Sequence, residues 1–222
     1  MANYTIDPQI LIPYLPAKTE LDLFEGKCFV SLIGFMFLDT KLKRFPIPFH
    51  QNFEEVNLRF YVRHKEGNAW KRGTVFIKEI VPKFMISLIA NTLYGEHYET
   101  RQMAHFWKID KDKMEVEYAW KAGDWHTIKI ETETELQEIK PDSESEFITE
   151  HYWGYTKLSE TNTSEYGVEH PRWRVYNTLT YNIDCNFEKN YGPDFSFLNH
   201  QKPNSVFLVE GSEILVRHGR II

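Results

Sequence analysis

The stretch Phe53–His64, FEEVNLRFYVRH, decides the fold, because apolar and polar residues alternate along it from Glu55 to Arg63. Side chains of a strand point to the two faces of a sheet in turn, so this period of two predicts a β-strand. Its apolar face would pack on the core and carries Val56, Leu58, Phe60 and Val62. Its other face carries Glu55, Asn57, Arg59, Tyr61 and Arg63.

The polar face of this strand has two interpretations. If it points to solvent, the mixture of charges has no further consequence. If it points into a barrel, a carboxylate, an amide and a guanidinium converge, as they do in a small-molecule site. Arg59 suits such a site because its planar guanidinium can hold a carboxylate through two hydrogen bonds. The spacing alone leaves both interpretations open.

Turn clusters separate short segments along the rest of the chain, which is the spacing of an antiparallel sheet or barrel. Further strands are expected at Cys28–Leu38, Lys113–Trp120, Trp173–Phe187, Val206–Val209 and Ile214–Val216. A turn at Lys121–Asp124 leads from the second of these into a partner strand. Along Trp173–Phe187, alternate residues that include Leu179 and Tyr181 would face the core.

Helices are expected in two or three places. Pro82–Tyr94 begins with a proline that suits a first turn, and Gly95 suits the position after the last turn. Phe84 and Leu88 would form part of its apolar stripe. Shorter helices are expected from Asp7-Pro8 to Pro13 and at Pro193–Asn199. The expected fold class is therefore mainly β (α+β), and the 222 residues fit one domain, residues 1–222.

The composition argues against several partners. With 26 Lys+Arg against 32 Asp+Glu the net charge is −6, and the longest basic run is Lys41–Arg44, so no nucleic-acid partner is expected. The chain lacks the pattern of a signal peptide, and its longest apolar stretches reach about half the length that spans a bilayer. We therefore expect a cytoplasmic protein without a membrane partner. Cys28 and Cys185 are expected to be buried free thiols.

Two segments that could form a hairpin, Thr149–Tyr155 and Glu165–Trp173, form a second constellation. Each contains a Glu-His dipeptide, Glu150-His151 in the first and Glu169-His170 in the second. In one register Glu150 would face His170 and His151 would face Glu169, which gives two attractive pairs. A register shifted by one would oppose the two glutamates instead. The loop between the segments fixes neither register.

These histidines and glutamates could also suggest a metal, since imidazole and carboxylate together bind zinc or iron. Adjacent residues of a strand point to opposite faces, however, so neither dipeptide can chelate from one side. We therefore predict no metal, and ligand-binding roles for His151, Glu169 and His170. The sequence contains no glycine-rich phosphate loop and no G-x-S-x-G, H-E-x-x-H or C-x-x-C motif, so no cofactor is predicted.

Several segments resemble the YqjF-like family. They are Val30–Phe35, Pro46–His50, Phe53–Val62, Phe147–Trp173 and Tyr191–Ser212, which follow the family's order over nearly the whole chain. The family is similar in fold to acetoacetate decarboxylase. The resemblance therefore implies an antiparallel β-barrel that encloses a polar pocket.

The resemblance also permits a test of the decarboxylase reaction. That enzyme forms a Schiff base on a lysine whose pKa is lowered by an adjacent lysine. The corresponding stretch here, Gly95–Arg101, has no lysine, and Lys78 and Lys83 are single residues on the other side of the helix. The resemblance thus argues against Schiff-base chemistry, while it implies that Glu55 lies in the cavity.

The first functional hypothesis is a barrel that binds a small molecule bearing a carboxylate or a carbonyl group. Glu55 would be its catalytic acid or base, Arg59 would hold the anion, and Asn57 and Tyr61 would line the site. The second hypothesis is a non-catalytic structural or interaction domain whose polar strand face is hydrated. The third is a metal-dependent enzyme. A homo-oligomer is compatible with each of them.

Overall fold

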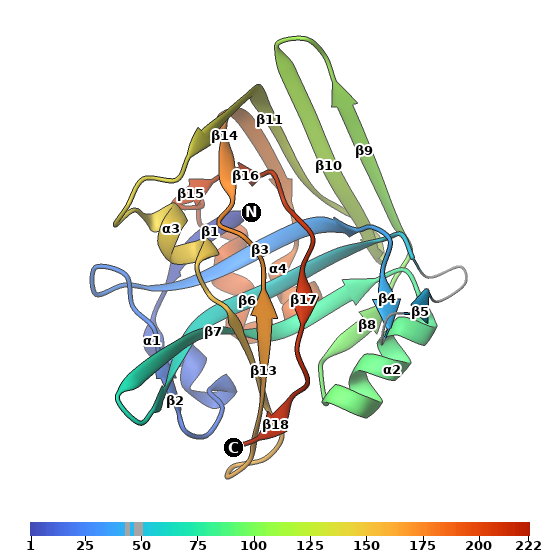
Figure 1. The fold of residues 1–222 in the computed structure, drawn as a ribbon. Helices are drawn as coiled ribbons and strands as arrows, with labels where there is room; N and C mark the ends of the chain where they lie inside the picture. The colour runs from blue at the N-terminus through green and yellow to red at the C-terminus, as the bar shows by residue number, and fades with distance from the viewer. Residues whose placement is uncertain (43–44, 47–50) are drawn as a thin grey trace.

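The computed structural model describes residues 1–42, 45–46 and 51–222 (Figure 1). Half of the basic run Lys41–Arg44 and most of the segment Pro46–His50 therefore lie outside the described residues. No helix in the described part of the chain combines the length and the apolar character needed to cross a membrane.

Strands dominate the described part of the chain, as predicted. They are β1 Ala2–Ile6, β2 Thr19–Leu21, β3 Cys28–Phe37, β4 Lys41–Leu42, β5 Phe45–Pro46, β6 Phe53–Glu66, β7 Ala69–Val81, β8 Tyr98–Thr100, β9 Met103–Ile109, β10 Lys113–Ala122, β11 Asp124–Glu138, β12 Trp153–Lys157, β13 Thr163–Glu169, β14 Arg174–Asp184, β15 Ser205–Val206, β16 Leu208–Val209, β17 Leu215–Val216 and β18 Arg220–Ile221. The α-helices are α1 Pro8–Leu11, α2 Phe84–Tyr94, α3 Glu144–Thr149 and α4 Phe187–Tyr191, and the 3₁₀ helices are η1 Ile12–Tyr14 and η2 Pro193–His200.

A large curled sheet, ordered β15-β1-β3-β6-β7-β12-β13-β17, contains most of the strands. Its pairings are antiparallel except where β7 meets β12 and β8. A second sheet is ordered β16-β14-β11-β10-β9, and its β9–β10 hairpin extends away from the large sheet in Figure 1. The neighbouring tail strands β15 and β16 join one sheet each, so the tail connects the two sheets.

The apolar face of β6 packs between the two sheets, as the alternation predicts. Val56, Leu58, Phe60 and Val62 are fully buried. They belong to one hydrophobic cluster with β10 and β11 side chains, which are Val116, Tyr118, Trp120, Ile128 and Ile130. The burial of these large side chains is the main favourable contribution to folding in this region.

Gly34 of β3 lies directly against side chains of the second sheet. A Cβ atom at this position would lie 2.8 Å from Cδ2 of Tyr118 and 3.2 Å from Cγ2 of Ile128. Gly34→Ala should therefore lower the free energy of unfolding by about 1–3 kcal/mol, the usual cost of overpacking a core. Urea denaturation measures the loss. Gly167→Ala is the matched control, since a Cβ there would meet no atom closer than 3.6 Å. Equal losses in the two variants would contradict the steric account.

The predicted helix Pro82–Tyr94 is confirmed as α2, which ends at Gly95 in the left-handed conformation (φ 69°). Its predicted apolar stripe is wrong, because Phe84 is 64% exposed and Leu88 is 46% exposed. The helix lies beside β8 at the rim of the sheet (Figure 1) and there buries Ser87, which bonds to Thr100. The predicted helix Pro193–Asn199 is the 3₁₀ helix η2, while α3 and α4 exceed the number of helices expected.

The strand predicted at Trp173–Phe187 is shorter, because β14 ends at Asp184 and Phe187 begins α4. Leu179 and Tyr181 of its predicted core face are exposed. Leu179 is skipped at an irregularity in the pairing of β11 with β14, and such bulges change which side chains point inward. Tyr181 still lies opposite the buried Ile130. Cys28 is buried, Cys185 is half-buried, and both are free thiols.

Candidate functional site

The polar face of β6 is buried on the side of the large sheet away from the second sheet. We call this side the inner face. Glu55, Asn57 and Tyr61 are each 1% exposed, and Arg59 is half-buried. The sheet curls so that Tyr166 of β13 comes close enough to Glu79 and Glu55 to sense their charges. The solvent-facing interpretation of this strand face is therefore wrong for these side chains.

A group of carboxylic acids occupies one end of the inner face. Glu55 accepts hydrogen bonds from Asn57 Nδ2 at 2.8 Å and from the Tyr98 hydroxyl at 3.2 Å. Glu79 of β7 lies beside Asn57 in the strand register and is 3% exposed. Glu96, which follows α2, accepts a hydrogen bond from Thr156 Oγ1 at 2.8 Å. Glu55, Glu79 and Glu96 are called the carboxyl cluster below.

Burial is the main influence on the acidity of this cluster. It raises the pKa of Glu55 to about 7, with smaller opposing effects from its hydrogen bonds to Asn57 and Tyr98. Burial, reinforced by the neighbouring carboxylates, raises the pKa of Glu79 well above its ordinary value. Burial also raises the pKa of Glu96 to about 6. Close carboxyl groups in a dry environment hold on to protons, so the cluster can give up or take up a proton near neutral pH.

Arg59 lies between the carboxyl cluster and the apolar end of the inner face. Its Nη2 donates to the carbonyl oxygen of Ile148 in a long contact of 3.4 Å, and its guanidinium carbon lies 5.6 Å from the centre of the Tyr61 ring. The Nε atom is buried and has no hydrogen-bond partner among the described residues. An unpartnered charged donor is costly, so such atoms are rare in folded proteins and usually mark a place for a ligand or water.

Tyr61 anchors the apolar end through a chain of hydrogen bonds. Its hydroxyl lies 2.7 Å from Ser31 Oγ, which donates to Asn3 Oδ1 at 2.6 Å. Phe147 of α3 covers the Tyr61 ring edge-on at 5.3 Å between centroids. The helix thus closes this end of the inner face.

His151 packs on Tyr61 with 4.7 Å between the ring centres. Its Nε2 lies 3.1 Å from Asp22 Oδ2, which also accepts from Arg72 Nε at 2.6 Å. Burial lowers the pKa of His151 to about 4, so the ring is neutral at pH 7. Burial tends to raise the pKa of Asp22, but hydrogen bonds from His151 and Arg72 outweigh it and hold that pKa below its usual range. We therefore assign the ring proton to Nε2, which leaves Nδ1 as a buried acceptor without a partner among the described residues.

The predicted hairpin has the favoured register, with Trp153 opposite Gly167. The two predicted side-chain pairs are wrong, because α3 ends at Thr149 and β12 begins only at Trp153. Glu150 instead accepts a hydrogen bond from the Tyr152 hydroxyl at 2.6 Å, and Glu169 pairs with Arg217 on the surface. His170 stacks on Trp173 and Tyr152, with 4.1 and 4.7 Å between ring centres.

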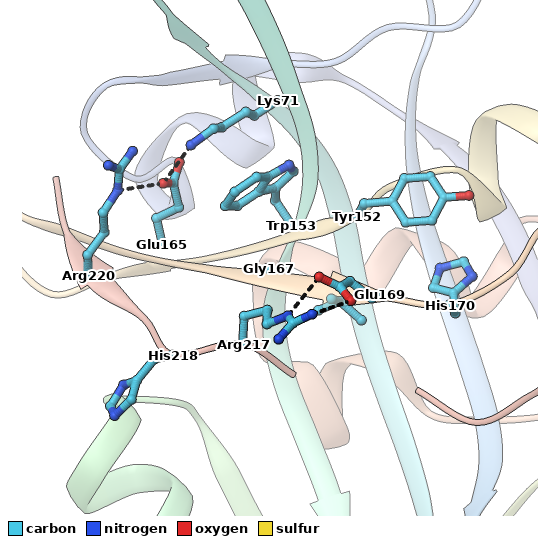
Figure 2. Close-up of a pocket in the computed structure, with 11 residues that line it drawn as sticks. Lys71, Tyr152, Trp153, Glu165, Gly167, Glu169, His170, Arg217, His218 and Arg220 are labelled. Carbon is cyan, nitrogen blue, oxygen red and sulfur yellow. Dashed lines mark hydrogen bonds and ion pairs between the residues drawn. The ribbon is translucent and has the colours of Figure 1, made fainter. Parts of the chain in front are cut away.

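An open pocket of about 490 Å³ lies along β12, β13 and the C-terminal strands (Figure 2). Glu165, which is almost completely buried, accepts from Lys71 Nζ at 3.0 Å and from Arg220 Nε at 2.9 Å. Lys71 Nζ also lies 3.9 Å from the centre of the Trp153 ring. The charged groups of this pocket are thus already paired with one another, whereas Arg59 Nε has no partner among the described residues.

The structure brings Glu55, Asn57, Arg59 and Tyr61 onto one face and adds His151 through its contact with Tyr61. His170 and Glu169 line the open pocket instead. Reasoning from sequence missed the inner-face residues that come from other elements, which are Glu79, Glu96, Tyr98, Thr156 and Tyr166. The sequence around Glu79, VFIKEIV, does not alternate, so it contained no signal for the face that Glu79 occupies. The neighbours of Glu79 depend on strand register.

Lys78 points to the opposite side of β7 from Glu79. Its Nζ donates to the carbonyl oxygen of Asn190 at 2.6 Å and pairs with Glu99 at 3.1 Å. Among the described residues, no group of three or more His, Cys, Asp or Glu side chains is arranged to hold a metal ion.

Comparison with known proteins identifies the family and the fold. The family model DUF2071, described as an uncharacterized conserved protein, matches residues 1–213. The uncharacterized protein YqjF of Bacillus subtilis (strain 168) is 35% identical over 65 residues, which are 29% of this chain and only 27% of that relative.

Three solved structures are similar over almost the whole chain. An acetoacetate decarboxylase-like enzyme from Sphingomonas wittichii RW1 has a TM-score of 0.58 at 13% identity, covering 99% of this chain and 86% of that one. The enduracididine biosynthesis enzyme MppR with HEPES bound has a TM-score of 0.64 at 12% identity, covering 100% and 84%. MppR complexed with pyruvate has a TM-score of 0.57 at 10% identity, covering 99% and 81%. Identities this low establish the fold alone. The chain has an acetoacetate decarboxylase-like fold and belongs to the DUF2071 family.

Proposed function

We propose that the protein binds a small organic molecule with a carboxylate or carbonyl group on the inner face of β6. The observation that carries this proposal is the buried Nε atom of Arg59, which has no partner among the described residues. A carboxylate at this atom would balance the charge of the guanidinium and accept a hydrogen bond from Nε–H. Tyr61 and His151 would form the wall beside it.

The acid-base properties of Glu55 support a catalytic version of this proposal. A group with a pKa of about 7 is partly protonated at neutral pH and can both donate and accept a proton. The natural reaction for such a group beside a bound carbonyl compound is proton transfer at the carbon next to the carbonyl. No Schiff base is included, since Lys78 is engaged with Asn190 and Glu99 on the other side of β7.

The comparison with MppR supports the proposed ligand class. MppR shares the fold and has been solved with pyruvate, a small molecule that carries both a carboxylate and a carbonyl group. Pyruvate is therefore the first compound to test on this chain.

A thermal-shift series with pyruvate, acetate and propionate tests the proposal. The wild-type protein should melt at a higher temperature with pyruvate, since a ligand at a hundred times its Kd stabilises by about 2.7 kcal/mol. Arg59→Ala should abolish the shift. Arg63→Ala is the matched control, because Arg63 is on the same strand but pairs with Glu20 at the surface. An equal shift in all three proteins would remove Arg59 from the account, and no shift in the wild type would count against the proposal.

A further inference from the structure

The inner face contains more than one polar atom that lacks a partner. Besides Arg59 Nε, the buried acceptors Asn57 Oδ1 and Glu79 Oε2 have no hydrogen-bond partner within the described part of the chain. Asn57 is 1% exposed and Glu79 is 3% exposed. A ligand that satisfies all three atoms needs a hydrogen-bond donor near Asn57 and Glu79 and an acceptor near Arg59.

The two acceptors share one place on the sheet. Asn57 and Glu79 are opposite each other in the pairing of β6 with β7, where side chains of one face lie about 5 Å apart at Cβ. Asn57 Nδ2 is already used for the bond to Glu55 Oε1, so its oxygen is the atom left over. The oxygens of Glu55 are occupied as well, by Asn57 and Tyr98. When its carboxyl groups are ionised, the cluster therefore offers acceptor atoms for which the described side chains supply no donor.

Charge favours a cation as the group that supplies these donors. Glu55, Glu79 and Glu96 are close enough to influence one another, and the positive charge of Arg59 also reaches Glu55. A protonated nitrogen offers several hydrogen-bond donors and a positive charge together. The positive charge of such a nitrogen would let the carboxyl groups release the protons that they otherwise retain. Asn57 is a neutral ligand well suited to such a nitrogen.

We propose that the ligand is a small zwitterion, whose carboxylate meets Arg59 Nε and whose protonated nitrogen meets Asn57 Oδ1 and Glu79 Oε2. This inference rests on the proposed function and specifies the substrate class of that same site. Asn57 and Arg59 are two residues apart on one strand, so their Cα atoms are separated by about 7 Å. That separation suits an amino acid whose nitrogen is several bonds away from its carboxylate.

Paired ligands that differ only in the nitrogen test the inference. We would titrate 4-aminobutyrate and butyrate into the wild-type protein by calorimetry, with β-alanine and propionate as a shorter pair. The amino compound should bind at least about tenfold more tightly than the plain acid, the gain expected of a buried charge-assisted hydrogen bond. Equal affinity for butyrate and 4-aminobutyrate would overturn the zwitterion while leaving the carboxylate site intact.

Variants assign the discrimination to the proposed atoms. Glu79→Gln should bring the affinity ratio close to one without weakening butyrate, and Asn57→Ala should lower the ratio through its own lost acceptor. Glu135→Gln, at an exposed glutamate of β11, should leave the ratio unchanged. A ratio that survives in both inner-face variants would contradict the inference. If neither compound binds, the inference fails, and the pyruvate series shows whether the proposed function fails with it.

Discussion

Replacing Glu55 and Glu79 together with glutamine should raise the melting temperature at pH 8 by about 6 °C or more. Burial raises the pKa of Glu55 to about 7 and that of Glu79 well above its ordinary value of 4.5. A shift of this size for Glu55 alone corresponds to about 3 kcal/mol of lost stability once the unfolded chain is ionised. One kcal/mol moves the melting temperature of a protein this long by about 2–4 °C.

The sign follows from proton binding. A carboxyl group with a raised pKa keeps its proton in the folded protein at pH values where the unfolded chain has lost its own. Its contribution to stability is therefore complete below pH 4.5 and is lost as the pH rises through about 7. His151 acts in the opposite direction, because its pKa falls from 6.5 to about 4 and its contribution is lost as the pH falls between these values. The buried amino group of Met1 acts in the same direction as His151, because burial lowers its pKa from 8.0 to about 5. Both groups are common to the wild type and the double variant, so the difference between the two proteins isolates the carboxyl groups.

Melting curves of both proteins between pH 5 and 9 measure this effect. The melting temperature of the double variant should rise relative to that of the wild-type protein as the pH increases. Glu135→Gln controls for the loss of one surface charge and should follow the wild type. A double variant that melts in parallel with the wild type would show that the carboxyl groups are not desolvated in the folded state.

Asp22→Ala should lower the free energy of unfolding at pH 7 by about 3 kcal/mol. Asp22 is buried and accepts from both Arg72 and His151, so its removal leaves two nitrogens without an acceptor. Removing one member of a buried ion pair typically costs 3–5 kcal/mol, and the partial exposure of Arg72 places this case at the low end.

Urea denaturation compares this loss with that of Glu20→Ala, which breaks the exposed ion pair with Arg63. An exposed pair contributes about 0–1 kcal/mol, so the control should lose little. Asp22→Asn should lie between the two because it keeps one acceptor oxygen but not the charge. If all three variants lose the same small amount, Asp22 does not hold His151 in place.

The fold was predictable because β6 carries an unambiguous period of two, and its four apolar side chains all reached the core. Whether the polar face of β6 is buried or exposed was not predictable from spacing, since it depends on whether β12, β13 and α3 cover it. The position of Glu79 beside Asn57 depends in addition on a register irregularity after Leu58. Such cross-strand neighbours are properties of the assembled sheet.

The second constellation shows a different limit. The register of β12 and β13 agrees with the one chosen for its attractive Glu-His pairs, yet those pairs do not form. The segment predicted from Thr149 becomes a strand only at Trp153, because a short helix runs to Thr149. Ser143 caps this helix by accepting a hydrogen bond from Glu146 N. His151 then turns to Asp22, which is 129 residues away in sequence. The correct register therefore has a different physical origin from the one supposed.

A crystal structure of the protein with pyruvate tests the central claim most directly. The account predicts a carboxylate oxygen at hydrogen-bond distance, about 2.7–3.2 Å, from Arg59 Nε, with the rest of the molecule against Tyr61 or Asn57. Pyruvate bound instead in the open pocket beside Trp153, or an Arg59 Nε covered by protein atoms alone, would contradict it.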